Sequence, residues 1–546
     1  MSSQQHIVMV AAENGALAGG KVGGVGDVIQ HLPPALSRYG CQITVVTPSY
    51  GTLHRAPGAR QRTAVTTPFA GKSESVKLFQ VPTELPNKSI RHWVLHHPQF
   101  AAAGSGVIYA SHDNDPFALD ATKFALFSQA LAELLLDDPE QQPDAVHLHD
   151  WHTAFLLLLR AAHPRYAPLR AIHSVFSVHN LALQGVRPFV EGEASLQAWY
   201  PDIDLRQARI AADPRWPSCV NPMLAGLMLA DQVHTVSPSY AAEIMQPSDP
   251  EIRGFSGGEG LDAALRGVHA EGRLHGILNG CDYPNPSQRA ERARNLSGKR
   301  TGALPDIRQW SDFLAACSRE LSRWAAQKPV LRSSHFVAGQ RVHELANRSV
   351  LRLLTSVTRV TDQKVKLLLQ SGNNGRSALD NLLDGLGDDG LYGLLGSGQG
   401  DYEHALTQVA AERDNFLFLN GYSDALANAL YSRGDLFLMP SSFEPCGISQ
   451  MIAMRHGQPC LVHGVGGLRD TVTHGKSGFV FTGENLIEQA DNFVHAAVDA
   501  LNLQRGQPER WREIKSQAAA QRFTWDVAAK QYKAVLYAPA PSVTLV

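Results

Sequence analysis

The chain has 546 residues, more than one hydrophobic core usually holds, so we expect two or three domains. Its 44% hydrophobic and 18% charged residues and its formal net charge of -2 are those of a soluble enzyme and argue against a general nucleic-acid or membrane-surface role. The six cysteines are scattered, which favours reduced thiols over a disulfide frame or a zinc cluster. Because no signal peptide or membrane-spanning run is apparent, we expect a cytoplasmic protein.

Apolar strand segments alternate with helical segments along the first half of the chain. The predicted strands are 7–12, 43–47, 76–81, 92–96, 145–149, 173–178 and 232–236, with a long helix at 121–136. A second series of strands is predicted at 350–360, 391–395, 416–419, 436–439 and 460–463. This alternation is typical of doubly wound α/β domains, so the fold class is α/β with two Rossmann-like lobes.

We place the domain boundary at 279–285, where prolines begin to interrupt regular structure. The predicted N-terminal lobe is 1–282, and the C-terminal lobe is 283–522, including a linker at 283–349 with a helical period at 310–326. The remaining residues, 523–546, begin with apolar residues at helical spacing. They predict a terminal helix that packs back on the N-terminal lobe.

A glycine-rich loop follows the first strand and precedes a helix predicted at 28–37. Gly23, Gly24 and Gly26 lower the steric barrier to backbone contact, and Lys21 supplies a cation for a phosphate or carboxylate. The loop is either an anion cradle or a flexible turn that starts a helix, and alone it favours neither. It is not a Walker A loop, because the lysine precedes the glycines, and it lacks the third glycine of a dinucleotide fingerprint.

Three histidines and an aspartate lie within residues 147–152, a density that invites a metal interpretation. Their spacing differs by one residue from that of metallo-hydrolases, and His147 lies inside a strand. We therefore predict a structural histidine at 147 and no metal. His179 ends a neighbouring strand at the same edge of the sheet, which places it facing a cleft.

The second lobe carries two further candidate segments. Arg359 and Lys364 share one strand-to-helix turn, where a planar fork and a point charge suit a diphosphate, although a solvated basic turn is the simpler alternative. Glu444 begins an exposed corner at the carboxyl end of the strand 436–439. After the next strand, Gly466 and Gly467 let the backbone approach closely, and a helix beginning near Leu468 would aim N–H groups at an anion.

These motifs occur in one order along nearly the whole chain: Lys-x-Gly-Gly at 21, Asn-Gly-x-Asp at 279 and Glu-Pro-Cys-Gly at 444. In that combination the chain resembles bacterial glycogen (starch) synthases, retaining glucosyltransferases of the two-lobed GT-B type. The resemblance implies an interlobe cleft, with the glucan acceptor on the N-terminal lobe and the nucleotide-sugar donor on the C-terminal lobe.

The resemblance also assigns roles to residues. Lys21, Gly23 and Gly24 match the loop that faces the donor's phosphates and sugar, and His179 matches a histidine placed against the transferred glucose. In the second lobe, Arg359 and Lys364 match the pair that holds the distal phosphates. Glu444 matches the acid beside the donor sugar, Tyr422 an aromatic that stacks on adenine, and Gly466, Gly467 and Leu468 the helix start at the diphosphate.

The resemblance implies transfer of glucose from ADP-glucose to the non-reducing end of an α-1,4-glucan, without a cofactor, a metal, a nucleic acid or a membrane. UDP-glucose as donor and a glucan-binding or regulatory protein with decayed activity are the alternatives. A phosphorylase with lysine-bound pyridoxal phosphate and a nicotinamide enzyme built on the glycine cluster 396–400 are weaker ones. Val365 and Leu183 depart from the family pattern, which has glycine and an aromatic residue there.

Overall fold

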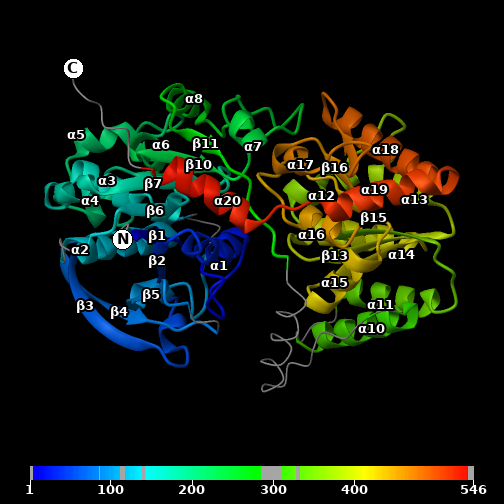
Figure 1. Cartoon of the computed structure of the whole chain (residues 1–546), viewed down its shortest axis with the longest axis horizontal. Coiled ribbons are helices and arrows are strands. Elements are labelled where there is room, and N and C mark those ends of the chain that lie inside the picture. Colours follow the sequence, from blue (N-terminus) through cyan, green and yellow to red (C-terminus); the bar gives the residue numbers. More distant parts are fainter. Residues whose placement is uncertain are drawn as a thin grey trace. The chain divides into compact units, whose positions relative to one another are not determined.

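The computed structural model describes residues 4–84, 87–110, 117–137, 142–283, 307, 309–327 and 332–538. The chain divides into two compact units (Figure 1). Unit 1 comprises Met1–Ser248, Ser256–Gly280 and Thr524–Val546, and unit 2 comprises Asp249–Phe255 and Cys281–Phe523. Of the predicted linker, Pro284 and the residues up to 306 lie outside the described residues, as does the end of the tail from Pro539.

Unit 1 is built on a nine-stranded sheet, counted over the described residues, in the order β11-β10-β7-β6-β1-β2-β5-β4-β3. Its strands are β1 (Gln5–Val10), β2 (Cys41–Pro48), β3 (Arg60–Phe69), β4 (Lys72–Gln80), β5 (Ile90–His96), β6 (Ala145–His149), β7 (His173–Val178), β10 (Gln232–Thr235) and β11 (Leu274–Gly276). The strands from β11 to β5 in that order pair in parallel, with Ile7 of β1 between Ile43 of β2 and Ala145 of β6. The strand order reverses between β1 and β6.

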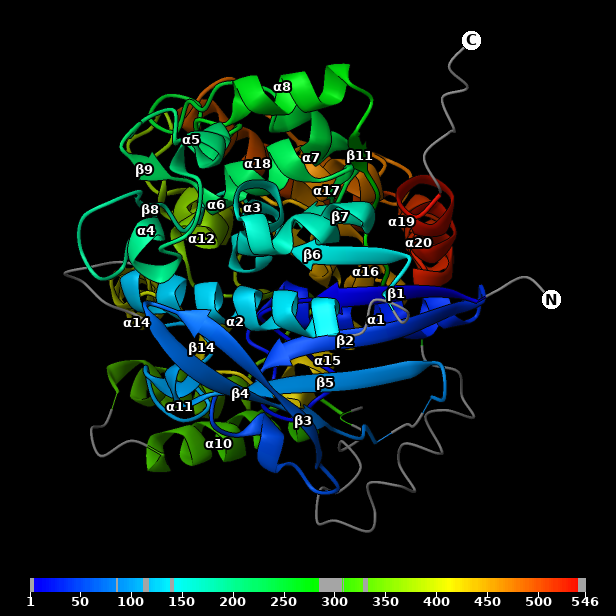
Figure 2. The same ribbon diagram turned by 90° about the vertical axis from the view of Figure 1, so that its left-hand side faces the viewer.

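The edge of this sheet departs from the expectation of a purely alternating pattern. The strand predicted at 76–81 is β4, which pairs antiparallel with β5 and with β3, a strand that was not predicted from the sequence (Figure 2). The first five residues of β3 are all exposed, so its sequence gives little of the alternation that marks a half-buried strand.

The helices of unit 1 cover both faces of the sheet. They are α1 (Gly24–Ser37), α2 (Ala118–Asp137), α3 (Phe155–Ala162), α4 (Leu196–Trp199), α5 (Leu205–Ala208), α6 (Pro222–Leu229), α7 (Pro238–Glu243), α8 (Asp262–Ala270) and α20 (Trp525–Gln531). A small sheet pairs β8 (Arg187–Pro188) with β9 (Cys219–Val220). As predicted, the terminal helix packs back on this unit, because Trp525 and Tyr532 share one core cluster with Val28 and Leu32 of α1.

Unit 2 contains a parallel six-stranded sheet in the order β14-β13-β12-β15-β16-β17, again counted over the described residues. The strands are β12 (Arg352–Val357), β13 (Gly390–Gly396), β14 (Phe416–Asn420), β15 (Leu436–Met439), β16 (Cys460–His463) and β17 (Gly478–Phe481). This is the strand order of a dinucleotide-binding fold, and it reverses between β12 and β15. The five strands predicted for this lobe are confirmed, whereas β17 was not predicted.

Two apolar layers enclose the sheet of unit 2, with alternate residues of β13 and β14 pointing into each. The helices are α10 (Trp310–Ala326), α11 (Ser333–Leu345), α12 (Asp362–Leu369), α13 (Ala378–Leu386), α14 (Gly400–Glu412), α15 (Asp424–Arg433), α16 (Ser449–Arg455), α17 (Gly466–Thr471), α18 (Leu486–Gly506) and α19 (Pro508–Ala520). Helix α10 has the bounds predicted from its helical period.

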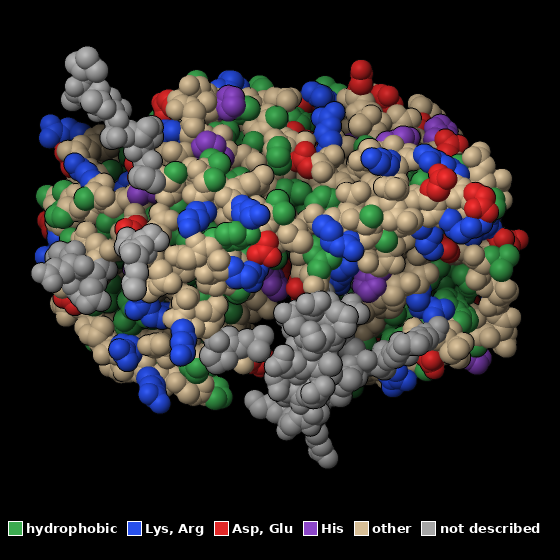
Figure 3. All heavy atoms as spheres, viewed as in Figure 1, with side chains coloured by type: hydrophobic (Ala, Val, Ile, Leu, Met, Phe, Trp, Pro, Cys, Tyr) green, Lys and Arg blue, Asp and Glu red, His purple; other side chains and the backbone are tan. Residues whose placement is uncertain are grey.

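The surface matches the balanced composition. Figure 3 shows basic, acidic and hydrophobic side chains of the described residues interspersed, without one dominant patch on that face. We find no candidate for a membrane-spanning segment among the described helices. All six cysteines are free thiols, and five of them are buried.

Candidate active site

In unit 1, the predicted site segments follow three neighbouring strands. The glycine-rich loop follows β1, Asp150 follows β6, and His179 follows β7. Since β1, β6 and β7 are parallel and adjacent, their carboxyl ends lie at one edge of the sheet. The order of the strands reverses between β1 and β6, and ligands of open α/β sheets bind at such a point.

The glycine-rich loop wraps around a carboxylate of the protein itself. Glu13 is buried, and its Oε2 accepts hydrogen bonds from the amides of Val22 at 2.8 Å, Gly23 at 2.6 Å and Gly26 at 3.3 Å. The Tyr109 hydroxyl donates to the other oxygen of Glu13 at 2.9 Å. The loop is therefore a cradle that already holds an anion. Glu13 was not among the predicted site residues, although an acid between the first strand and a glycine loop was a usable signal.

What the loop leaves open to a ligand is the first turn of α1. A Cβ at Gly26 would lie 2.7 Å from Lys21 Cγ and 2.9 Å from Glu13 Oε2, whereas a Cβ at Gly24 would meet nothing within 4 Å. The amides of Gly24 and Val25 have no acceptor within the described part of the chain. Lys21 is partly exposed and forms an ion pair with Asp27 at 2.5 Å. An anion could thus approach at Gly24, beside Lys21.

The histidines in β6 and directly after β7 are buried, and burial lowers their pKa values. His147 is satisfied by the Tyr537 hydroxyl and by Ser177 Oγ, both at 2.6 Å, which confirms its structural interpretation. His179 Nε2 lies 2.9 Å from His149 Nδ1, and burial lowers the pKa of His179 to about 4. No group of three or more histidine, cysteine or acidic side chains among the described residues could hold a metal ion.

Asp150 fixes the backbone of this edge. Its φ of 56° is left-handed, a conformation that costs about 1–3 kcal/mol in a residue other than glycine and clusters at functional sites. Its carboxylate accepts the amide of His179 at 2.7 Å, and burial raises the pKa of Asp150 to about 7. The strained turn and its carboxylate therefore hold His179 in place.

In unit 2, the structure brings Lys364 and Glu444 together. Lys364 lies in the first turn of α12, after β12, and Glu444 follows β15, so the two sit on either side of the point where the strand order reverses. Lys364 Nζ donates to Glu444 Oε2, and the side chains are only 13% and 8% exposed. Gln363 bonds the backbone of both Phe443 and Ser442, which locks the two turns together.

Arg359 differs from Lys364 in its surroundings. It is exposed, and its guanidinium has no hydrogen bond or ion pair to any residue that the structure describes. Tyr422, at the carboxyl end of β14, is 61% exposed, and its hydroxyl donates to Asp424 at 2.7 Å. Both side chains are accessible to a ligand of unit 2.

The glycines at the start of α17 are required by packing. Gly466 has a φ of 44°, and a Cβ there would lie 2.0 Å from the carbonyl oxygen of Glu444, while a Cβ at Gly467 would lie 2.3 Å from that of Cys446. The amides of Gly467 and Leu468 donate within the protein, to Glu444 and Val465. Leu468 buries its side chain in the core. The anion contact expected at this helix start stays a prediction.

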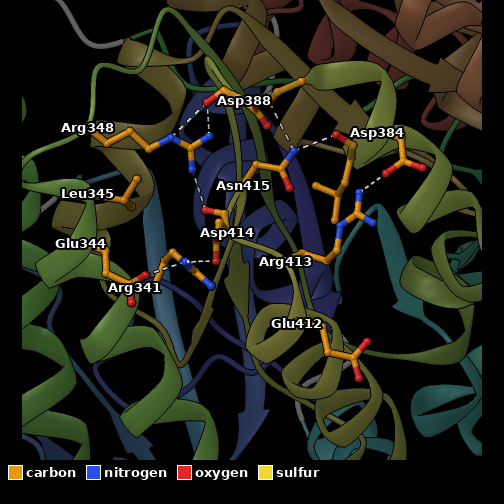
Figure 4. Close-up of a pocket in the computed structure, with 12 residues that line it drawn as sticks. Arg341, Glu344, Leu345, Arg348, Asp384, Asp388, Glu412, Arg413, Asp414 and Asn415 are labelled. Atoms are coloured by element: carbon orange, nitrogen blue, oxygen red, sulfur yellow. Dashed lines mark hydrogen bonds and ion pairs between the residues drawn. The ribbon is translucent and has the colours of Figure 1, made fainter.

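A cavity of about 720 Å³ in unit 2 lies elsewhere (Figure 4). It is lined by residues of α11 and α13 and by the segment 412–415 before β14, so it sits at the amino-terminal edge of the sheet, opposite to Lys364. Its charged groups are largely paired with one another, as in Arg341 with Asp414 and Arg413 with Asp384 (Figure 4). Size alone does not make it the donor site.

Two protein families match this chain, one mainly in unit 1 and the other in unit 2. A family described as "Starch synthase catalytic domain" matches residues 6–267, and one described as "Glycosyl transferases group 1" matches residues 388–502. The glycogen synthase of Streptococcus equi subsp. equi is 32% identical over 536 residues, which cover 96% of this chain and 98% of that protein. This chain belongs to the glycogen synthase family. The glycogen synthase of Desulfitobacterium hafniense is 30% identical over 526 residues, or 94% and 95% of the two chains.

Solved structures agree with this assignment. The catalytic domain of Starch Synthase IV from Arabidopsis thaliana, bound to ADP and acarbose, superposes with a TM-score of 0.72 at 25% identity, over 98% of this chain and 99% of that one. Sucrose-phosphate synthase from Thermosynechococcus elongatus, at 15% identity and a TM-score of 0.52 over 97% and 98%, shares the fold alone. This member of the family is therefore a glycosyltransferase with a GT-B fold, as predicted.

The two departures from the family pattern have different structural settings. Val365 is completely buried in the core beneath α12, directly after Lys364, so its side chain anchors that turn. Leu183 is 56% exposed after β7 and leaves an apolar rather than an aromatic surface there.

Proposed function

We propose that this protein transfers glucose, with retention of configuration, from ADP-glucose to the non-reducing end of an α-1,4-glucan. The observation that carries the proposal is the Lys364–Glu444 ion pair, whose side chains are 13% and 8% exposed, at the reversal point of a parallel sheet. A lysine held there is a preorganised positive charge at the place where such sheets bind nucleotides.

Unit 2 would stabilise the leaving group. When the bond between the anomeric carbon and the diphosphate oxygen breaks, negative charge develops on ADP. Lys364 offers a point charge and Arg359 a planar fork for those oxygens. Because Glu444 and the locked turns already hold Lys364, little reorganisation is needed as the charge develops.

Unit 1 would contact the sugar through a neutral histidine and the phosphates through its glycine-rich loop. His179 is an uncharged imidazole, which suits hydrogen bonding to a hydroxyl better than binding a phosphate. The free amides at Gly24 and Val25 and the ammonium of Lys21 would face the phosphates.

In a front-face reaction, the acceptor's O4 forms the new bond to the anomeric carbon, and its proton passes to the departing phosphate oxygen. Both configuration and proton balance are then preserved without a separate base.

Both substrates are inferred. The plant relative that was solved with ADP and acarbose supports an adenine nucleotide and a glucan-like acceptor for this chain. The accessible Tyr422 could stack on either adenine or uracil, so UDP-glucose stays the alternative donor. The absence of a cofactor and a cytoplasmic location remain predictions from the sequence.

The test is to incubate the protein with glycogen and either ADP-glucose or UDP-glucose, and to measure nucleoside diphosphate release and chain extension. We expect ADP release with chain growth, and a much slower reaction with UDP-glucose. Glucan binding without turnover of either donor would contradict the proposal and favour a regulatory protein. A preference for UDP-glucose would change only the identity of the donor in this proposal.

A further inference from the structure

A chain of hydrogen bonds through the interior of unit 1 has only one direction when its histidines are neutral. It starts at the carbonyl of Ile277, which can only accept, so His234 Nε2 at 3.3 Å must donate. His234 Nδ1 then accepts from Ser177 Oγ at 2.7 Å, and Ser177 accepts from His147 Nε2 at 2.6 Å. His147 Nδ1 finally accepts from the Tyr537 hydroxyl at 2.6 Å. Burial lowers the pKa of both histidines, which keeps them neutral.

His149 connects this fixed chain to His179. Its ring stacks on that of His147 with centroids 4.2 Å apart, and its Nδ1 lies 2.9 Å from His179 Nε2. Its Nε2 is buried and has no hydrogen-bond partner among the described residues. The ring of His149 is therefore held on one face and bonded at one nitrogen.

The unpartnered nitrogen decides which tautomer His149 adopts. A buried N–H without an acceptor is rarer in proteins than an under-used acceptor, and leaving it unpaired costs about 1–3 kcal/mol. The proton of His149 therefore belongs on Nδ1, which donates to His179 Nε2. As a neutral ring, His179 must then carry its own proton on Nδ1, the nitrogen that makes no hydrogen bond within the described part of the chain.

We propose that His149 is a positioning residue that fixes His179 in the Nδ1–H tautomer, so that His179 presents a hydrogen-bond donor to an oxygen of the bound sugar. This rests on the proposed function for the contact between His179 and the substrate. It also means that His179 does not act as a base, since its acceptor nitrogen is occupied by His149.

Substitutions at 149 separate the hydrogen bond from packing. His149→Asn keeps a donor where Nδ1 lies, whereas His149→Leu removes it. We expect His149→Leu to lower kcat about 10- to 100-fold, as is typical when a partner that orients a functional histidine is lost, and His149→Asn to recover most of it. In the His179→Ala background, both substitutions at 149 should give the same rate. His275→Leu, on the outer strand β11, is the matched control and should leave kcat unchanged.

Equal rates for His149→Asn and His149→Leu in the otherwise unchanged protein would overturn the proposal, because packing alone would then explain the effect. So would a kcat of His149→Leu equal to that of the starting protein.

A second measurement does not depend on turnover. In full-length protein with ¹⁵N-labelled histidine, two-bond ¹H–¹⁵N correlations distinguish the two neutral tautomers, and His179→Ala identifies the signals of His179. We expect the Nδ1–H pattern for His179 and a change of that pattern in His149→Leu. An Nε2–H pattern would refute the assignment even in an active enzyme. The Nδ1–H pattern in a protein that turns over no nucleotide sugar would support it while the proposed function fails.

Discussion

The two units place their candidate residues at the same position of the same kind of sheet but differ in the groups that they bury there. At the reversal point of unit 1, the buried groups are neutral or enclosed, because burial lowers the pKa of His179 and amides surround Glu13, and the cation Lys21 is partly exposed. At the reversal point of unit 2, the partly buried Lys364 forms an ion pair with the buried Glu444. The fold therefore supplies the location, while the side chains after each strand determine whether it suits a sugar hydroxyl or a diphosphate.

Lowering the pH should destabilise unit 1 before unit 2, and this is the largest effect that we expect. A histidine whose folded-state pKa lies below its ordinary value contributes stability that is complete above pH 6.5 and is lost as the pH falls toward the folded-state value. For His179, with a pKa of about 4, the loss between pH 7 and 5 is about 2 kcal/mol. Asp150, with its raised pKa, acts in the opposite direction and offsets about one histidine.

Because burial also lowers the pKa of His147, His149 and His234, we expect a net loss of several kcal/mol in unit 1. Urea titrations between pH 7 and 5, with limited proteolysis to locate the unfolding segments, measure it. A free energy of unfolding that stays constant over this range, or early cleavage confined to unit 2, would contradict the comparison.

Replacing the charged Lys364 of unit 2 should lower both the catalytic rate and the stability. Lys364→Met loses a preorganised cation, for which we expect a kcat about 10²- to 10³-fold lower. It also leaves Glu444 buried and unpaired, which typically costs about 3–5 kcal/mol. Steady-state kinetics and urea unfolding measure the two effects. Lys366→Met, on the same helix and partly exposed, is the matched control and should change neither.

The double variant Lys364→Met/Glu444→Gln sharpens this result. With both charges gone, most of the lost stability should return, while the rate should stay low. If the rate returned along with stability, the pair would be structural and the proposed role of Lys364 would be wrong.

Arg359 should show the catalytic effect without the structural one. Because Arg359 is exposed and has no partner among the described residues, we expect Arg359→Ala to lower kcat about 10²-fold while the free energy of unfolding changes by less than about 0.5 kcal/mol. Arg512→Ala, which removes another exposed arginine of unit 2, should have no effect on rate. Equal kcat values for the two variants would remove Arg359 from the site.

The smallest effect should come from neutralising the enclosed carboxylate of unit 1. Glu13→Gln keeps the shape but replaces charge-assisted hydrogen bonds by neutral ones, so the free energy of unfolding should fall by about 1–2 kcal/mol and the KM for the donor should rise. Glu193→Gln, at an exposed position of the same unit, is the control. An unchanged stability would mean that the loop does not depend on the charge of Glu13.

The architecture was largely predictable because apolar parallel strands are strong local signals. The strand Leu436–Met439 and the helix Trp310–Ala326 have the bounds expected from the sequence. The exposed hairpin strand β3 was missed because it has little hydrophobic period. Contacts between distant segments were also out of reach. Nothing near Lys364 in the sequence indicates that Glu444, 80 residues away, takes its ammonium group, or that Gly466 is required by the carbonyl of Glu444.

The final helix of unit 1 ends in a wide turn with consequences for engineering. Tyr532–Leu536 is a π-helical turn, in which the amide of Tyr537 donates to the carbonyl of Tyr532 at 3.1 Å. That extra residue per turn delivers both tyrosine hydroxyls to the buried imidazoles. A chain shortened to Leu536 would lose the donor to His147 and leave a void in the core of unit 1. Trimming or fusion at this terminus should therefore begin beyond Tyr537, because the last turn serves as interior, not as a tail.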